Sequence, residues 1–150
     1  MVRGCWVPVL LFASLAGCDA PPPAPVPETT DPETGRWYRV SQVEAGRKVF
    51  ADHCAVCHGD EAQGLAADWR VRLADGSFPP PPLNGTAHAW HHPLSVLLQT
   101  IDEGGIPLGG KMPPFGSVLT QAEKLAAIAY FQHFWDGQTY ADWLAMGGTN

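Results

Sequence analysis

The sequence predicts an all-α fold of three to five helices, because three segments place their apolar residues at helical intervals. The first segment begins at Ser41, the second at Pro93 or Leu94, and the third at Thr120. In each of them apolar side chains recur every three or four residues, which gathers them on one face of a helix. A shorter helical turn is expected near residues 140–145.

The first and last of these segments carry helix-start signals. Ser41 with Glu44, and Thr120 with Glu123, have the spacing of a capping box, in which the two side chains satisfy free backbone N–H groups of the first turn. Gly46 lies on the apolar face of the first segment, although glycine lowers helix propensity. We therefore expect another helix to cross closely at Gly46.

The stretch between the first two helices is less regular. Apolar and basic residues alternate over residues 70–73, ahead of Asp75-Gly76. This pattern is compatible with a small hairpin or with an irregular loop. The run of four prolines at residues 79–82 forbids regular structure there.

The N-terminal part of the 150-residue chain has the features of an export signal. Residues 1–17 place Arg3 ahead of an apolar run that is too short to span a bilayer comfortably. The run ends in Leu15-Ala16-Gly17-Cys18, which resembles the lipobox of bacterial lipoproteins and predicts acylation of Cys18. The alternatives are an ordinary cleaved signal and an uncleaved anchor.

Residues 18–35 are interpreted as the lipidated cysteine followed by a proline-rich tether, and residues 36–150 as the folded domain. Six prolines in the tether alternate with polar residues and leave no apolar face to bury, which favours extended polyproline II. Fully extended, the tether would reach on the order of 50 Å, at about 3.1 Å per residue.

Residues 54–58, Cys-Ala-Val-Cys-His, form the most informative motif of the chain. The thiols of Cys54 and Cys57 lie on one side of a helical turn, where each can form a thioether with one vinyl group of a haem. His58 can then offer a ring nitrogen to the iron. A redox dithiol or half of a zinc site is the alternative, but no second Cys-x-x-Cys and no preceding strand pattern support it. We therefore predict one covalently bound haem c.

Several motifs occur in an order that resembles the class I c-type cytochromes. They are Cys54 to Gly59, Pro82-Leu83, a middle helix, Lys111-Met112-Pro113-Pro114-Phe115 and a capped final helix. The resemblance covers about residues 41–135 and implies a monohaem cytochrome c fold, with the N- and C-terminal helices crossing near the haem. Gly46 and Phe50 are then expected to meet an aromatic residue of the last helix, with Tyr130 the best candidate. The resemblance implies no role for the tail after Trp135.

Met112 is expected to be the second axial ligand of the iron. Of the two methionines after Cys18, Met112 lies in a Gly/Pro-rich loop that can bring a thioether to the iron, whereas Met146 lies in the extra tail. Pro113 and Pro114 stiffen this loop by fixing φ. The resemblance implies the same His/Met ligation of the haem.

The resemblance also implies that a proline carbonyl accepts a hydrogen bond from the second ring nitrogen of His58. Pro82 is the best match for this acceptor, and Pro81 is the alternative. Leu83 and Phe115 are expected to pack against the haem.

Three histidines and a tryptophan occur within residues 86–92. His88, His91 and His92 are compatible with contacts to haem propionates, with a copper or zinc site, with replacement of Met112 at the iron, or with an exposed loop.

With His58 and Met112 on the iron, no open site remains for a substrate, and the remaining chemistry is the gain and loss of one electron. We therefore expect an electron-transfer protein rather than an enzyme acting alone, held on the periplasmic side of a bacterial membrane.

Asp19, after the lipidated cysteine, favours the inner membrane. The net charge of −6 excludes nucleic acid and favours redox partners with a basic docking surface. The alternatives are a gas sensor or weak peroxidase with a labile sixth ligand, and a copper-handling module that uses residues 88–92.

Overall fold

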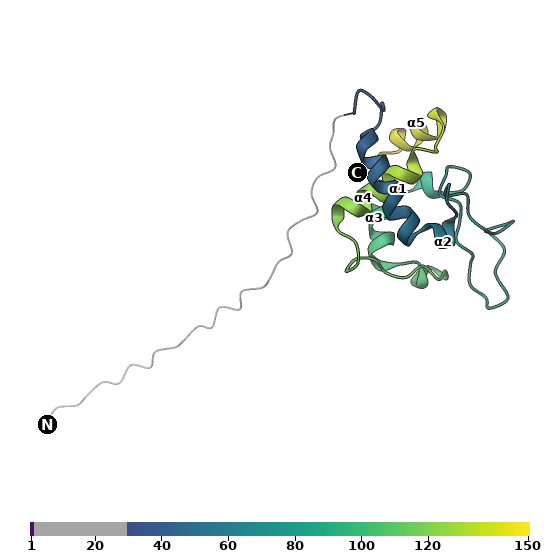
Figure 1. The fold of residues 1–150 in the computed structure, drawn as a ribbon. Helices are drawn as coiled ribbons and strands as arrows, with labels where there is room; N and C mark the ends of the chain where they lie inside the picture. The colour runs from purple at the N-terminus through teal and green to yellow at the C-terminus, as the bar shows by residue number, and fades with distance from the viewer. Residues whose placement is uncertain (2–29) are drawn as a thin grey trace.

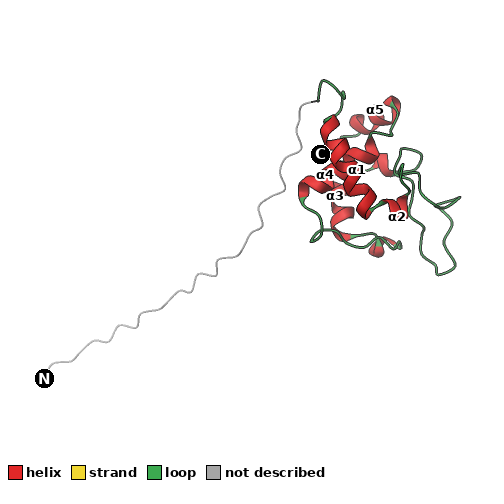
Figure 2. Cartoon of the chain, in the orientation of Figure 1, coloured by secondary structure: helices red, strands yellow, loops and turns green. Residues whose placement is uncertain are grey.

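The computed structural model describes Met1 and residues 30–150, and this part of the chain forms a bundle of α-helices (Figures 1 and 2). The helices are α1 (Val40–His53), α2 (Ala55–His58), α3 (Leu94–Glu103), α4 (Gln121–Gln132) and α5 (Gly137–Ala145), with 3₁₀ turns at Ala89–His91 and Ile106–Leu108. No strand occurs among residues 30–150, and the predicted all-α class is confirmed. The predicted signal peptide, Cys18 and most of the tether lie outside the described residues.

Helices α1 and α4 cross at the centre of the fold (Figure 1). A Cβ atom on Gly46 would lie only 1.9 Å from the carbonyl oxygen of Ala126, so only glycine permits this approach. One turn further along α1, the rings of Phe50 and Tyr130 pack with their centroids 5.1 Å apart. The expected close crossing at Gly46 and the contact with Tyr130 are both confirmed.

The predicted start of α1 is wrong. The helix begins at Val40, so Ser41 lies inside its first turn, and the backbone N–H of Arg39 donates to Gln42 Oε1 at 3.0 Å. Glu44 instead pairs with Arg47 at 3.5 Å on the exposed surface. The helix starts early because Trp37 and Tyr38, the two residues before the N-cap Arg39, are buried and fix the chain just ahead of the helix.

The predicted start of α4 and the predicted bounds of α3 agree closely with the structure. In α4 the N–H of Glu123 donates to Thr120 Oγ1 at 3.3 Å, and the N–H of Thr120 donates to Glu123 Oε2 at 2.8 Å, as a capping box requires. Helix α3 follows Pro93 and ends before Gly104, whose φ of +79° favours glycine. Asp75 and Gly76 lie in a turn that no strands flank. Of the two alternatives that the sequence left open, this stretch is therefore an irregular loop and not a hairpin.

The chain before α1 folds against the end of α4. Arg36 donates from Nη1 to the carbonyl of Gln132 and from Nη2 to that of Trp135, both at 2.7 Å. These carbonyls lie at or just beyond the C-terminal end of α4, where a cation is favoured. The guanidinium also lies 4.4 Å from the centre of the Tyr140 ring, which joins this segment to α5.

The residues just before Arg36, which were assigned to the tether, also contact the folded domain. Residues 31–35 form a hydrogen-bonded turn, in which the N–H of Thr34 donates to Asp31 Oδ1 at 3.0 Å and Thr34 Oγ1 donates to the carbonyl of Tyr38 at 2.5 Å. Burial of Trp37 and Tyr38 draws this turn onto the domain.

Helix α5 is longer than the predicted helical turn and closes the fold. The Trp143 indole donates to the carbonyl of His92 at 2.9 Å, and the N–H of Leu94 donates to the carbonyl of Gly148 at 2.7 Å. The tail is thus fixed to the start of α3. None of the helices within residues 30–150 combines the length and the apolar character needed to cross a bilayer.

Gly46→Ala should lower the free energy of unfolding by about 3 kcal/mol, because the new Cβ collides with backbone and forces α1 away from α4. Urea unfolding followed by far-UV circular dichroism measures the loss. Gly137→Ala is the control, since a Cβ there meets nothing within 4 Å at the start of α5. Equal free energies of unfolding for the two variants would contradict the claim that the close approach at Gly46 stabilises the domain.

Candidate haem site

The two thiols of the motif lie where α1 gives way to α2. Cys54 separates the two helices, and its carbonyl accepts the N–H of His58 at 2.9 Å, which keeps residues 54–58 in a helical turn. Both cysteines are free; Cys54 is half-buried and Cys57 is exposed. Burial raises the pKa of the Cys54 thiol to about 11, with a smaller contribution from Cys57. Both thiols are thus presented from one turn.

The His58 imidazole is buried and has a defined orientation. Its Nδ1 lies 2.9 Å from the carbonyl oxygen of Pro81, so Nδ1 carries the donated proton and Nε2 keeps its lone pair. Burial lowers the pKa of His58, opposed by the hydrogen bond to Pro81, and favours the neutral ring. A neutral imidazole held at one nitrogen is the usual arrangement of a metal-ligating histidine.

The acceptor is therefore Pro81 and not Pro82, the residue that the sequence favoured. Successive carbonyls of an extended proline run point in directions that differ by about one third of a turn, so only one of them can face the ring. Pro82 instead packs against Gly64: a Cβ on Gly64 would lie 3.1 Å from Pro82 Cδ.

Leu83 is fixed from two sides. Its N–H donates to the carbonyl of Ala62 at 2.7 Å, and its own carbonyl accepts the Trp135 indole N–H at 2.7 Å. The side chain of Leu83 packs partly buried against the core. The segment that orients His58 is thus tied both to the loop after the motif and to the chain beyond α4.

Met112 lies half-buried in the loop of residues 104–119. Its carbonyl accepts the N–H of Gly105 at 2.9 Å, and the N–H of Phe115 donates to the carbonyl of Ile101 at 2.9 Å. The ring of Phe115 lies 6.1 Å from that of His53, the residue before Cys54. The loop that carries Met112 therefore closes on the end of α3 and reaches the start of the cysteine motif.

The donor set fits haem. Two free thiols on one turn, an imidazole with Nε2 available and a thioether in a proline-stiffened loop are the groups that hold a c-type haem. Among residues 30–150 no three His, Cys, Asp or Glu side chains gather into a site for a bare metal ion.

The histidines of residues 88–92 are spread over aromatic neighbours. His88 stacks on Trp69 with centroids 4.7 Å apart and contacts His92 edge-on at 5.5 Å, whereas His91 packs on Trp90 at 3.9 Å. The Nδ1 atom of His88 is buried without a hydrogen-bond partner in the described protein. This arrangement does not support the copper or zinc interpretation.

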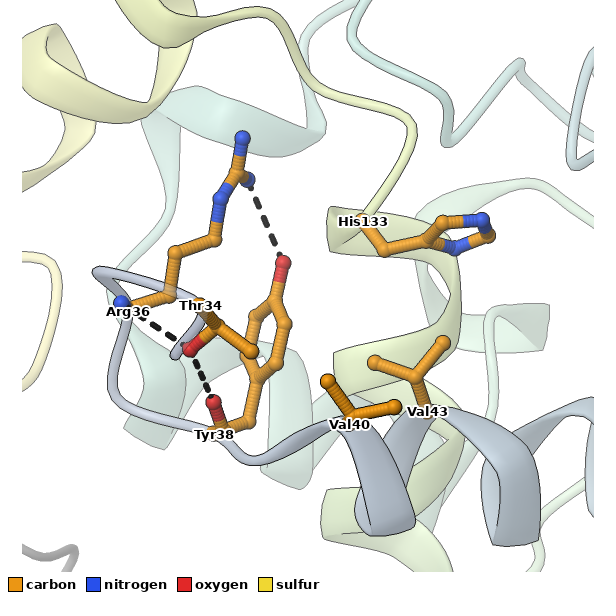
Figure 3. A pocket seen from close by; sticks show the side chains of 6 residues that line it. All are labelled: Thr34, Arg36, Tyr38, Val40, Val43 and His133. Atoms are coloured by element: carbon orange, nitrogen blue, oxygen red, sulfur yellow. Dashed lines mark hydrogen bonds between the residues drawn. The ribbon is translucent and has the colours of Figure 1, made fainter. Parts of the chain in front are cut away.

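A shallow pocket at the opposite end of α1 has no part in this site (Figure 3). It is lined by Thr34, Arg36, Tyr38, Val40, Val43 and His133. Val40 and His53 are the two ends of α1, about 20 Å apart at roughly 1.5 Å per residue. The pocket contains no thiol and results from the turn at residues 31–35 lying beside α1.

The helix crossing and the motif define a c-type cytochrome domain of class I. The sequence model of the family described as cytochrome c oxidase, cbb3-type, subunit III matches residues 41–131, and the chain belongs to this family. The domain is accordingly a haem-binding, electron-transferring one.

Curated relatives share this domain within longer proteins. The cbb3-type cytochrome c oxidase subunit FixP of Sinorhizobium medicae is 34% identical over 94 residues, 59% of this chain and 28% of the relative. Subunit CcoP of Rhodobacter capsulatus is 29% identical over 63% of this chain and 30% of its own length. A thiosulfate dehydrogenase of Stutzerimonas stutzeri is 31% identical over 69% of this chain and 29% of its own length. The match spans less than a third of each of these relatives, and no solved structure matches the chain.

Gly64→Ala should disturb the orientation of His58, because the added Cβ presses on Pro82, next to the acceptor Pro81. Gly76→Ala is a matched control: φ is +73° at Gly64 and +81° at Gly76, but a Cβ at Gly76 meets nothing within 4 Å. Both variants should lose about 1 kcal/mol of stability from backbone strain. Only Gly64→Ala should also shift the haem absorption spectrum and the reduction potential. Identical spectra for the two variants would contradict this role of Gly64.

Proposed function

We propose that this chain is a membrane-tethered, extracytoplasmic electron-transfer protein with one haem c, bound through Cys54 and Cys57 and ligated by His58 and Met112. The observation that carries the proposal is the hydrogen bond from His58 Nδ1 to Pro81, beside two free thiols. It leaves Nε2 as the nitrogen available to iron in the motif that attaches haem.

Haem c, when bound, supplies an iron couple that gains and loses one electron. His58 and Met112 would both bind the iron, which would leave no coordination site for a substrate. Methionine sulfur favours the reduced iron and raises the potential. Leu83 and Phe115 would shield the ring from water, which acts in the same direction.

The fixed backbone around both ligands supports a carrier over a gas sensor or a weak peroxidase. His58 is held by Pro81, and the Met112 loop is closed by hydrogen bonds to Gly105 and Ile101. A sensor or peroxidase needs a sixth ligand that leaves easily. A loop closed on the end of α3 opposes such a departure.

Redox proteins are the proposed partners. The relatives include subunits of a cytochrome c oxidase and a thiosulfate dehydrogenase, so one domain type serves in proteins of different activity. With a net charge of −6, this chain would be guided toward a donor or acceptor with a basic docking surface.

Lipidation of Cys18 would hold the domain at the outer side of a bacterial inner membrane. Because Asp31 already belongs to the folded turn, the tether would comprise residues 19–30. An extended polyproline II chain of that length reaches roughly 40 Å, at about 3.1 Å per residue.

Met112→Ala should leave haem attached, since Cys54 and Cys57 are intact, but it should open the sixth position. The ferric protein should lose its methionine-sulfur charge-transfer band and become high-spin, the ferrous protein should bind carbon monoxide, and the potential should fall. Met146→Ala is the control, because Met146 is 48% exposed in the tail. Retention of the band and of carbon monoxide exclusion in Met112→Ala would exclude Met112 as the ligand.

Cys18→Ser should release the haem protein from membranes into the soluble extracytoplasmic fraction. Cys5→Ser should remain with the membranes, because Cys5 precedes the predicted cleavage site and leaves with the signal. Cell fractionation followed by haem staining compares the two variants. Membrane attachment of Cys18→Ser would favour an uncleaved anchor over a lipid.

A further inference from the structure

Lys124 is a buried lysine that sits in the helix crossing the haem-motif helix. It occupies the first turn of α4, and its side chain is only 8% exposed. Its Nζ donates to Asp102 Oδ1 at 2.5 Å, and Asp102 lies in the last turn of α3. Burial of an ammonium group is unfavourable unless a partner compensates it, so the position of Asp102 is strongly coupled to that of Lys124.

The ammonium group of Lys124 stabilises the carboxylate of Asp102. Asp102 and Glu103 place two carboxylates at the C-terminal end of α3, where the helix dipole already concentrates negative charge. Helix α3 has no basic residue in its last turn. Lys124, from a different helix, supplies the missing positive charge and joins the two helix ends.

The same helix end carries the Met112 loop. The carbonyl of Asp102 accepts the N–H of Gly116 at 3.2 Å, next to the hydrogen bond between Phe115 and Ile101. The part of the loop around Met112 contacts the same helix end. A Cβ on Gly104 would lie 2.6 Å from the carbonyl oxygen of Met112, so the loop lies directly on the end of α3. A shift of this helix end would therefore move the loop both at Met112 and at residues 115–116.

We infer that the ion pair of Lys124 and Asp102 positions Met112, by fixing the end of α3 to α4 and so holding the methionine loop closed. This inference rests on the proposed ligation by Met112. Lys124 is a positioning residue: it acts on the thioether through Asp102 and the loop backbone, without contacting the iron.

The test uses the full-length holoprotein and the variants Lys124→Met, Asp102→Asn and the double variant. Each single variant should keep its haem but bind carbon monoxide in the ferrous state at least about tenfold faster, because loss of the pair favours the open loop. The ferric methionine-sulfur band should disappear on heating before the far-UV signal does. Lys48→Met is the control, since Lys48 pairs with Asp52 at 2.6 Å on the exposed side of α1.

The double variant separates positioning from general stability. Removing both charges leaves no unpaired buried ion, so its unfolding midpoint should recover toward that of the wild type. Its carbon monoxide binding should remain fast, because the connection between α3 and α4 is still missing. If Lys124→Met does not fold, the more exposed Asp102→Asn and the double variant still decide the outcome.

Two results would overturn the inference, and they are distinguishable. A wild-type ferric protein without the methionine band would remove the proposed ligation and the positioning role together. A wild-type protein with the band, but with variants whose carbon monoxide binding changes no more than in Lys48→Met, would remove the positioning role alone.

Discussion

The close approach of α1 to α4 at Gly46 is the contact on which the rest of the domain depends. The carbonyl of Ala126 occupies the space that a side chain at residue 46 would need. Helix α1 ends directly before Cys54. Helix α4 contributes Tyr130 and Lys124 and leads to Trp135, whose indole N–H donates to the carbonyl of Leu83. The crossing therefore sets the distance between the thiols and the segments that complete the site.

Around this crossing, backbone groups hold the candidate ligands more than side chains do. A proline carbonyl orients His58, and the loop of Met112 is closed by N–H and C=O groups of the α3 end. Backbone fixed in this way changes little when a bound iron changes oxidation state. Small rearrangement on oxidation is the property that an electron carrier requires. If Met112 binds the iron as proposed, the same rigidity opposes exchange of its thioether for an external ligand.

The sequence predicted features that depend on local spacing and missed those that depend on direction or distance. The Thr120 and Glu123 capping box and the glycine at the crossing follow from helical periodicity. Pro81 and Pro82 are adjacent members of one proline run, and only the path of the chain determines which carbonyl faces His58. Arg36 contacts carbonyls nearly a hundred residues away, which no local pattern reveals. A lysine directly before the apolar run of residues 125–131 in α4 was a usable signal, because such a side chain needs a partner when it is buried.

Residues that precede the family match determine where the chain enters the domain. Arg36 binds the chain just before α1 to the end of α4, at the opposite end of α1 from the cysteines. The chain before α1 thus meets the domain at the far end of a helix about 20 Å long, at roughly 1.5 Å per residue. If Cys18 anchors the chain, the membrane attachment and the haem motif lie at opposite ends of one rigid helix. Burial of Trp37 and Tyr38 keeps the chain before α1 in place on the domain.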